Sequence, residues 1–182
     1  MKWAPVTIVS GSPGSGKSTL ARLLADQDSV GVHLQTDDFF DYVAHKIDPS
    51  QPASATQNAV VLSAYLAAAD AFVSGGYHVY LDGVIGPWWF DQIGKTFPKV
   101  ELIFLHVDLD IALARTQKRA ADTGVPAPEH MVREMNKQFA AIHKWGKQRI
   151  DVGQLTPQAL LEEVVDRRAR GMLDVTLAKA DA

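Results

Sequence analysis

The chain has 182 residues, 47% of them hydrophobic, and a formal net charge of −3. This composition fits one α/β domain over residues 1–182, and the slightly acidic balance argues against nucleic acid as a partner. The absence of cysteine excludes disulfides and thiolate metal sites, and no apolar run reaches membrane-spanning length, so we expect a cytoplasmic protein without a membrane partner.

The first half of the chain alternates short apolar runs with helical patterns. Residues 6–9 form a β-branched run that leads into Gly11, and leucines at helical spacing follow from about Lys17. A second strand is expected over residues 30–35, and an alanine-rich helix over residues 56–74 follows a proline-containing break. This alternation predicts a mostly parallel sheet with helices packed on it.

The second half continues the same alternation. The expected elements are strands over 77–81 and 100–107, helices over 111–121 and 131–142, a short strand over 148–152, a helix that begins at Thr156-Pro157, and a tail over about 172–182. A breaker-rich loop separates the two helices in the middle of this half. We therefore expect a helix–loop–helix lid over about residues 111–143.

The strongest motif lies between the first strand and the first helix. It matches the phosphate-binding pattern G-x-x-x-x-G-K-[ST] followed by threonine, and its residues are Gly11, Ser12, Pro13, Gly14, Ser15, Gly16, Lys17, Ser18 and Thr19. Glycines allow the backbone to curl around phosphate oxygens, and the helix N-terminus adds partial positive charge. The motif and its context predict a site for the phosphates of ATP.

Two side chains of this region suit the chemistry of a bound nucleotide. Lys17 supplies a cation for the terminal phosphates, and the Ser18 hydroxyl is a ligand for Mg²⁺, which prefers oxygen donors. Asp82 ends an apolar strand at the edge where open α/β sheets bind ligands, so we expect it to hold Mg²⁺ through water. An ordinary strand-ending acid is the alternative for Asp82.

Asp37 and Asp38 end the second predicted strand and are the candidate acceptor-side carboxylates. We expect Asp37 to orient and deprotonate an acceptor hydroxyl and Asp38 to cap or support the next segment. The aromatic cluster at residues 87–90 has two interpretations, a wall of the acceptor pocket or part of the core.

Arg115 and Arg119 lie four residues apart, so one helical face presents both of them, as closing a lid over phosphate requires. A solvated face is the alternative, and Arg133 and Lys137 are weaker candidates for the same role. The six histidines show no metal-ligand spacing, and we interpret His78 and His143 as structural.

These motifs together resemble the small P-loop kinases grouped with chloramphenicol phosphotransferase, zeta toxins and gluconate kinase. The resemblance rests on Gly11 to Thr19, Asp37-Asp38-Phe39, Leu81-Asp82-Gly83 and Arg115-x-x-x-Arg119. It implies an α/β P-loop NTPase fold with a five-stranded parallel sheet in the order 2-3-1-4-5, helices on both faces and a helical lid. It also implies an acceptor-side aspartate at Asp37, lid arginines at Arg115 and Arg119, and an adenine-side loop at residues 151–155.

The function expected from these residues is Mg²⁺-dependent transfer of the ATP γ-phosphoryl group to an unidentified small molecule with a hydroxyl. A regulatory ATPase or GTPase is one alternative, although Asn136 to Phe139 lacks the aspartate of the guanine-reading motif and Asp91 to Gly94 does not follow a strand. A nucleoside, nucleotide or sugar-nucleotide kinase is the other alternative. The sequence leaves the acceptor and the oligomeric state open.

Overall fold

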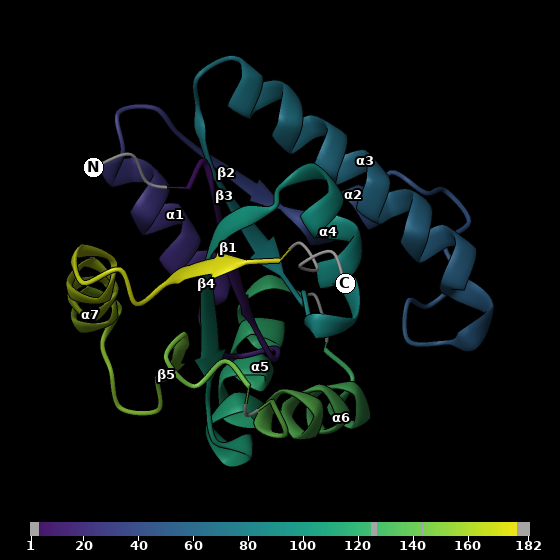
Figure 1. Ribbon diagram of the computed structural model, residues 1–182. Coiled ribbons are helices and arrows are strands. Elements are labelled where there is room, and N and C mark those ends of the chain that lie inside the picture. The colour runs from purple at the N-terminus through teal and green to yellow at the C-terminus, as the bar shows by residue number, and fades with distance from the viewer. Residues whose placement is uncertain (1–3, 125–126, 143, 178–182) are drawn as a thin grey trace.

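The computed structural model describes residues 4–124, 127–142 and 144–177, and within them six strands form one sheet (Figure 1). The strands are β1 (Val6–Gly11), β2 (Gly31–Gln35), β3 (His78–Gly83), β4 (Lys99–His106), β5 (Arg149–Asp151) and β6 (Asp174–Thr176). The first five pair in parallel in the order β2-β3-β1-β4-β5, which confirms the predicted strand order.

The sixth strand lies in the segment predicted as a C-terminal tail. β6 runs antiparallel to the start of β4, where Val175 pairs with Val100 and Thr176 with Lys99. The core of the described residues consists of two clusters of buried side chains, and Val175 belongs to the larger one, whereas its neighbours in β6 are exposed. A three-residue strand with one buried side chain leaves no periodic pattern, so the sequence predicted one strand fewer than the structure contains.

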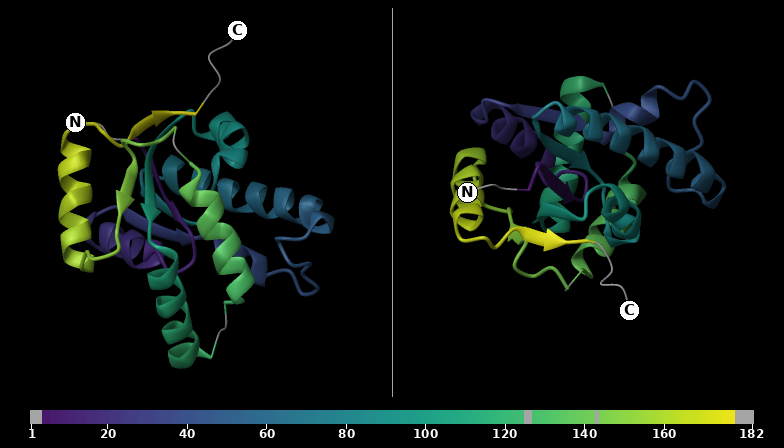
Figure 2. Two further views of the ribbon diagram at one scale, coloured as in Figure 1. Left: turned by 90° about the horizontal axis from the view of Figure 1, so that it is seen from below. Right: turned by 45° about the horizontal axis from the view of Figure 1, so that its top comes forward.

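Helices cover both faces of the sheet because successive strand residues point to opposite sides. Ile8 packs with α3 and α4, and Val9 packs with α1 and α7; α3 and α7 lie on opposite sides of the strands (Figure 2). The helices are α1 (Lys17–Gln27), α2 (Thr36–Asp41), α3 (Ala55–Ser74), α4 (Phe90–Thr96), α5 (Leu109–Thr123), α6 (Glu129–Ala140) and α7 (Pro157–Ala169), with short 3₁₀ turns η1 (Pro52–Ser54) and η2 (Pro87–Trp89). None of the helices described is both long enough and apolar enough to cross a membrane.

The predicted lid corresponds to α5 and α6, and α6 is anchored to the body of the domain. Val132 is fully buried and Phe139 nearly so, and the Asn136 amide donates a hydrogen bond to the Val107 carbonyl at 2.7 Å. These three residues form the buried stripe of α6. The spacing of Met131, Met135 and Phe139 in the sequence predicts a stripe that includes the two methionines, but both are only half-buried. Residues 125–126 of the predicted loop, and His143, lie outside the described residues.

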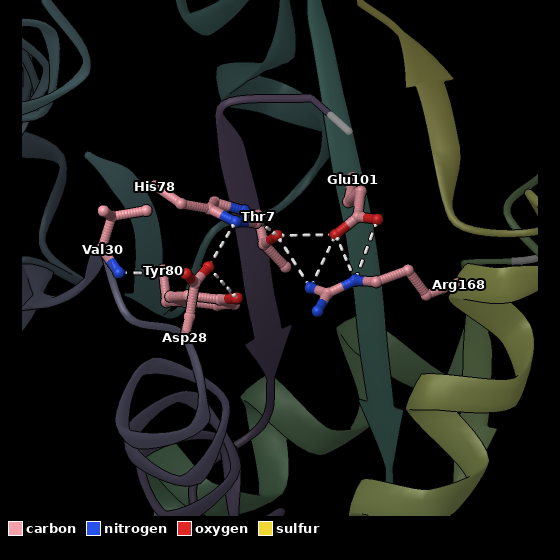
Figure 3. Close-up of polar contacts among 7 residues, drawn as sticks. All are labelled: Thr7, Asp28, Val30, His78, Tyr80, Glu101 and Arg168. Atoms are coloured by element: carbon pink, nitrogen blue, oxygen red, sulfur yellow. Dashed lines mark hydrogen bonds and ion pairs between the residues drawn. The ribbon is translucent and has the colours of Figure 1, made fainter. Parts of the chain in front are cut away.

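A buried polar network joins the strands at the end of the sheet remote from the phosphate-binding motif (Figure 3). The Thr7 hydroxyl contacts His78 Nε2 at 2.9 Å and donates to Glu101 at 2.7 Å, and His78 Nδ1 lies 3.0 Å from Asp28. Arg168 of α7 completes the network through Glu101. Because Asp28 follows α1, the network fixes both α1 and α7 to the sheet. It also shows that the predicted structural role of His78 is correct.

Candidate active site

The phosphate-binding motif forms the turn from β1 into α1, as the sequence predicts. Gly14 and Gly16 have φ values of 81° and 90°, in the left-handed region that side chains disfavour. A Cβ on Gly14 would also lie 2.7 Å from the Ala112 carbonyl oxygen of α5. The sequence thus places glycine where both the backbone angle and the neighbouring helix exclude a larger residue.

The first turn of α1 fits an anion. Gly16 is the N-cap residue, and in the part of the chain that the structure describes no side chain caps this turn with a hydrogen bond. The amides that a helix leaves unpaired at its start, together with the helix dipole, attract phosphate oxygens. Lys17 begins the helix and is 7% exposed, so it is largely buried at the phosphate-binding motif. These features fit the triphosphate of a nucleotide.

Ser18 and Asp82 meet at the carboxyl ends of β1 and β3. The Ser18 hydroxyl donates to Asp82 Oδ1 at 2.9 Å, and Asp82 is 1% exposed. A hydroxyl and a carboxylate side by side at the phosphate loop are the oxygen ligands that Mg²⁺ takes together with nucleotide phosphates and water. The described residues contain no group of three or more His, Asp or Glu that could hold a metal ion alone, so phosphate would have to complete the coordination.

His33 also contacts Asp82, and the sequence analysis did not single it out. His33 Nε2 lies 2.7 Å from Asp82 Oδ2, on the side of the carboxylate that does not face Ser18. β2 and β3 pair in parallel, with His33 opposite Tyr80 and Gln35 opposite Asp82. The contact depends on this register between distant segments. Only a correct pairing of the two predicted strands could have revealed it.

Asp37 lies within electrostatic range of three other predicted site residues, Lys17, Asp82 and Arg119. Solvent reaches its side chain, yet desolvation by the surrounding protein is the main cause that raises the pKa of its carboxyl group above the ordinary value. The charges of Lys17 and Arg119 oppose that rise in pKa, and the charge of Asp82 adds to it. Burial and the Asp37 charge also raise the pKa of the Tyr65 phenol, so Asp37 faces a neutral Tyr65.

Asp38 does not cap the next segment, which corrects the prediction made for it. α2 begins at Thr36, its N-cap residue is Gln35, and no side chain among the residues described here caps it with a hydrogen bond. Asp37 and Asp38 both belong to the first turn of α2, where negative charge interacts favourably with the helix dipole. The capping prediction failed because α2 starts three residues earlier than an N-cap at Asp38 requires.

Arg115 and Arg119 project from α5 but have different surroundings. The Arg115 guanidinium donates long hydrogen bonds to the Gly14 carbonyl at 3.4 Å and to the Gly153 carbonyl at 3.3 Å. Arg115 therefore connects the phosphate loop to the segment after β5, the predicted adenine-side loop. The Arg119 side chain is exposed, and its charge acts on Asp37.

The remaining candidates of the sequence analysis lie apart from this group. In the aromatic cluster, Phe90 is buried in the core, whereas Trp88 is 51% exposed and packs edge-on against Phe139. The core interpretation therefore holds for Phe90 and fails for Trp88. Arg133 pairs with Glu129 along α6 at 2.6 Å, and Lys137 is exposed on the same helix.

The two motifs considered for a GTPase have structural roles instead. Asn136 binds a backbone carbonyl of the domain, and Phe139 is part of the core. Asp91 and Gly94 both lie within α4, and Gly94 is buried there. Neither segment forms the loop that guanine recognition or a γ-phosphate switch requires, so both sequence matches are accidental.

Comparison with known proteins supports the same fold. A family model described as "AAA domain" matches residues 6–142. No curated protein matches the chain.

Among solved structures, a sugar kinase from Janibacter sp. HTCC2649 is 18% identical, with a TM-score of 0.71 over 96% of this chain and 98% of that one. A gluconokinase from Sinorhizobium meliloti 1021 is 14% identical, with a TM-score of 0.62 over 94% of this chain and 95% of that one.

A chain of the Pnkp1/Rnl/Hen1 RNA repair complex is 17% identical, with a TM-score of 0.65. The match covers 100% of the present chain but only 51% of the chain from the complex. Identities this low establish the fold alone. The resemblance to small P-loop kinases is confirmed at that level.

Proposed function

Since the chain belongs to the AAA-domain family, we propose that it is an ATP-dependent kinase that transfers the γ-phosphoryl group to a hydroxyl of a small molecule. One observation carries this proposal: the Asp37 carboxylate lies in the field of Lys17, Arg119 and Asp82. An acceptor-side carboxylate near the phosphate loop is what transfer to a hydroxyl needs, whereas a binding switch does not need it.

Each side chain has a distinct role in the proposed reaction. The loop from Gly11 to Thr19 binds the phosphates through the backbone amides of its residues other than Pro13, and Lys17 neutralises the charge that develops on the transferred group. Ser18 and Asp82 would hold Mg²⁺, which supplies further charge neutralisation on the phosphate oxygens when it is bound. Asp37 aligns the acceptor hydroxyl and takes its proton, for which its raised pKa is favourable.

Arg119 would approach the transferred phosphoryl group from α5, since its side chain is exposed and its charge acts on Asp37. Arg115 would act on the nucleotide indirectly, because its hydrogen bonds hold two backbone segments together. This division modifies the expectation that both arginines close over phosphate as a pair.

The experiment is a screen for ADP release that depends on an acceptor, with ATP and Mg²⁺ supplied. Sugars, aminoglycosides, phenicols, nucleosides and sugar nucleotides are the first acceptors, and a short RNA with a 5′-hydroxyl is added because one structural neighbour belongs to an RNA repair complex. Lys17→Ala is the control and should abolish release. Nucleotide binding without stimulation by any acceptor would contradict the kinase proposal and favour a switch.

A further inference from the structure

The Asp82 carboxylate has two partners, one on each oxygen. Ser18 donates to Oδ1 at 2.9 Å, and His33 Nε2 lies 2.7 Å from Oδ2. The His33 side chain is 16% exposed and that of Asp82 is 1% exposed, so their contact is sheltered from competing water. The two hydrogen bonds fix the plane of the carboxylate and distinguish its two oxygens.

The direction of the hydrogen bond from His33 follows from its partner. An ionised carboxylate only accepts hydrogen bonds, so Nε2 of His33 carries the proton and donates it. His33 comes from β2, and Ser18 comes from α1. Asp82 on β3 is therefore held from two independent elements, and loss of the bond from β2 would leave Ser18 as its only side-chain partner among the described residues.

We propose that His33 is a positioning residue that orients Asp82 for Mg²⁺ bound together with the nucleotide. This inference rests on the proposed function, in which Ser18 and Asp82 hold the metal ion. Mg²⁺ tolerates little distortion of its ligands, and groups that orient such ligands commonly change metal affinity about 10–100-fold when they are removed. In this role His33 acts through its contact with Asp82 and is not itself a ligand of the metal.

The test measures binding of a non-hydrolysable ATP analogue by calorimetry over a range of Mg²⁺ concentrations. His33→Ala should raise the Mg²⁺ concentration needed for tight binding about 10–100-fold and leave metal-free binding of the analogue unchanged. His33→Gln should bring the required Mg²⁺ concentration most of the way back to the wild-type value, since the amide nitrogen of glutamine can reach the position of Nε2. His45→Ala is the matched control, because His45 is exposed in the segment after α2 and should behave as the wild type.

A second measurement needs no nucleotide. Long-range ¹H–¹⁵N spectra of the free protein should show the His33 proton on Nε2, and Asp82→Asn should shift the His33 nitrogen signals but not those of His45. Equal loss of analogue binding with and without Mg²⁺ in His33→Ala would assign His33 a general structural role and overturn the proposal. Wild-type binding that does not depend on Mg²⁺ would also overturn it. Mg²⁺-dependent binding with no acceptor-stimulated ADP release would contradict the kinase proposal alone.

Discussion

Arg168 and Glu101 form an ion pair that is almost wholly buried, with Nη2 of Arg168 2.7 Å from Oε2 of Glu101 and side chains 5% and 2% exposed. Removal of one partner leaves the other charge buried and unpaired. Arg168→Ala should therefore lower the free energy of unfolding by about 3–5 kcal/mol. Urea denaturation measures this change. Arg170→Ala is the matched control, because its pair with Asp166 is exposed and should contribute less than about 1 kcal/mol.

The same network makes stability depend on pH through His78. Burial, and after it the Arg168 charge, lowers the pKa of His78 in the folded protein. The unfolded chain therefore binds the proton more readily, and stability should fall as the pH drops below about 6.5, the ordinary pKa of histidine. Desolvation alone would raise the pKa of Asp28, but hydrogen bonds from Val30 and Tyr80 outweigh it and lower that pKa. A further loss of stability should therefore follow at pH values below the ordinary pKa of aspartate.

Urea denaturation at pH 7.5 and pH 5.5 tests the contribution of His78. His78→Asn should flatten the dependence of unfolding free energy on pH between these two values. His45→Asn should leave that dependence intact, because His45 is exposed. An unchanged pH dependence in His78→Asn would show that His78 is not the group that titrates.

Two serines of the β1–α1 segment should respond oppositely to removal of the hydroxyl. The Ser15 hydroxyl is buried and has no hydrogen-bond partner among the described residues, so Ser15→Ala should leave stability unchanged or raise it by up to about 1 kcal/mol. The Ser10 hydroxyl donates to the Ile85 carbonyl at 2.8 Å and accepts from the Ile85 amide at 3.0 Å. Ser10→Ala should cost about 1–3 kcal/mol. Thermal and urea unfolding of the two variants give the comparison.

Asp37 and Asp38 should separate catalysis from local structure. Asp37→Asn removes the negative charge and should reduce phosphoryl transfer roughly a hundredfold or more, while the nucleotide still binds. Asp38→Asn should have a small effect, since the Asp38 side chain is exposed in the first turn of α2. Acceptor-dependent turnover with calorimetric titration of ATP decides between them. The reverse ranking would move the base to Asp38.

The two arginines of α5 should affect different kinetic constants. Arg119→Ala should lower kcat with little loss of ATP affinity, because the proposed contact forms mainly in the transition state. Arg115→Ala should weaken ATP binding, because its guanidinium joins the carbonyls of Gly14 and Gly153. Steady-state kinetics and equilibrium binding of each variant test this distinction. A loss of kcat alone in Arg115→Ala would restore the paired-lid interpretation.

Much of the fold could be predicted because its signals are local. The β-branched run of β1, the glycines before Lys17 and the Thr156-Pro157 start of α7 each depend on neighbouring residues, and Thr156 does accept a hydrogen bond from the Ala159 amide. β6 could not be predicted, because it exists only through its pairing with β4.

The site divides in the same way. Ser18 and Asp82 were recognised from a motif and a strand end, whereas the contact between His33 and Asp82 needs the register of two strands. Glu101 was hidden for a related reason. It lies in a strand that is otherwise almost entirely apolar, and its partner Arg168 is 67 residues away. Nothing local marks either residue as buried.

The position of β6 also affects whether copies of this chain associate through the edge of the sheet. β4 pairs with β5 through residues 104–106 and with β6 through residues 99–101, so two short strands of opposite direction share one edge of β4. Without β6, the first part of that edge would present unpaired amides and carbonyls, and Val100, which β6 now helps to bury, would lose its partner Val175. Unpaired edges of this kind recruit strands from other molecules. A chain shortened to residue 171 should therefore keep its phosphate-binding motif and yet self-associate. In this view, β6 protects the edge of β4 from pairing with other molecules.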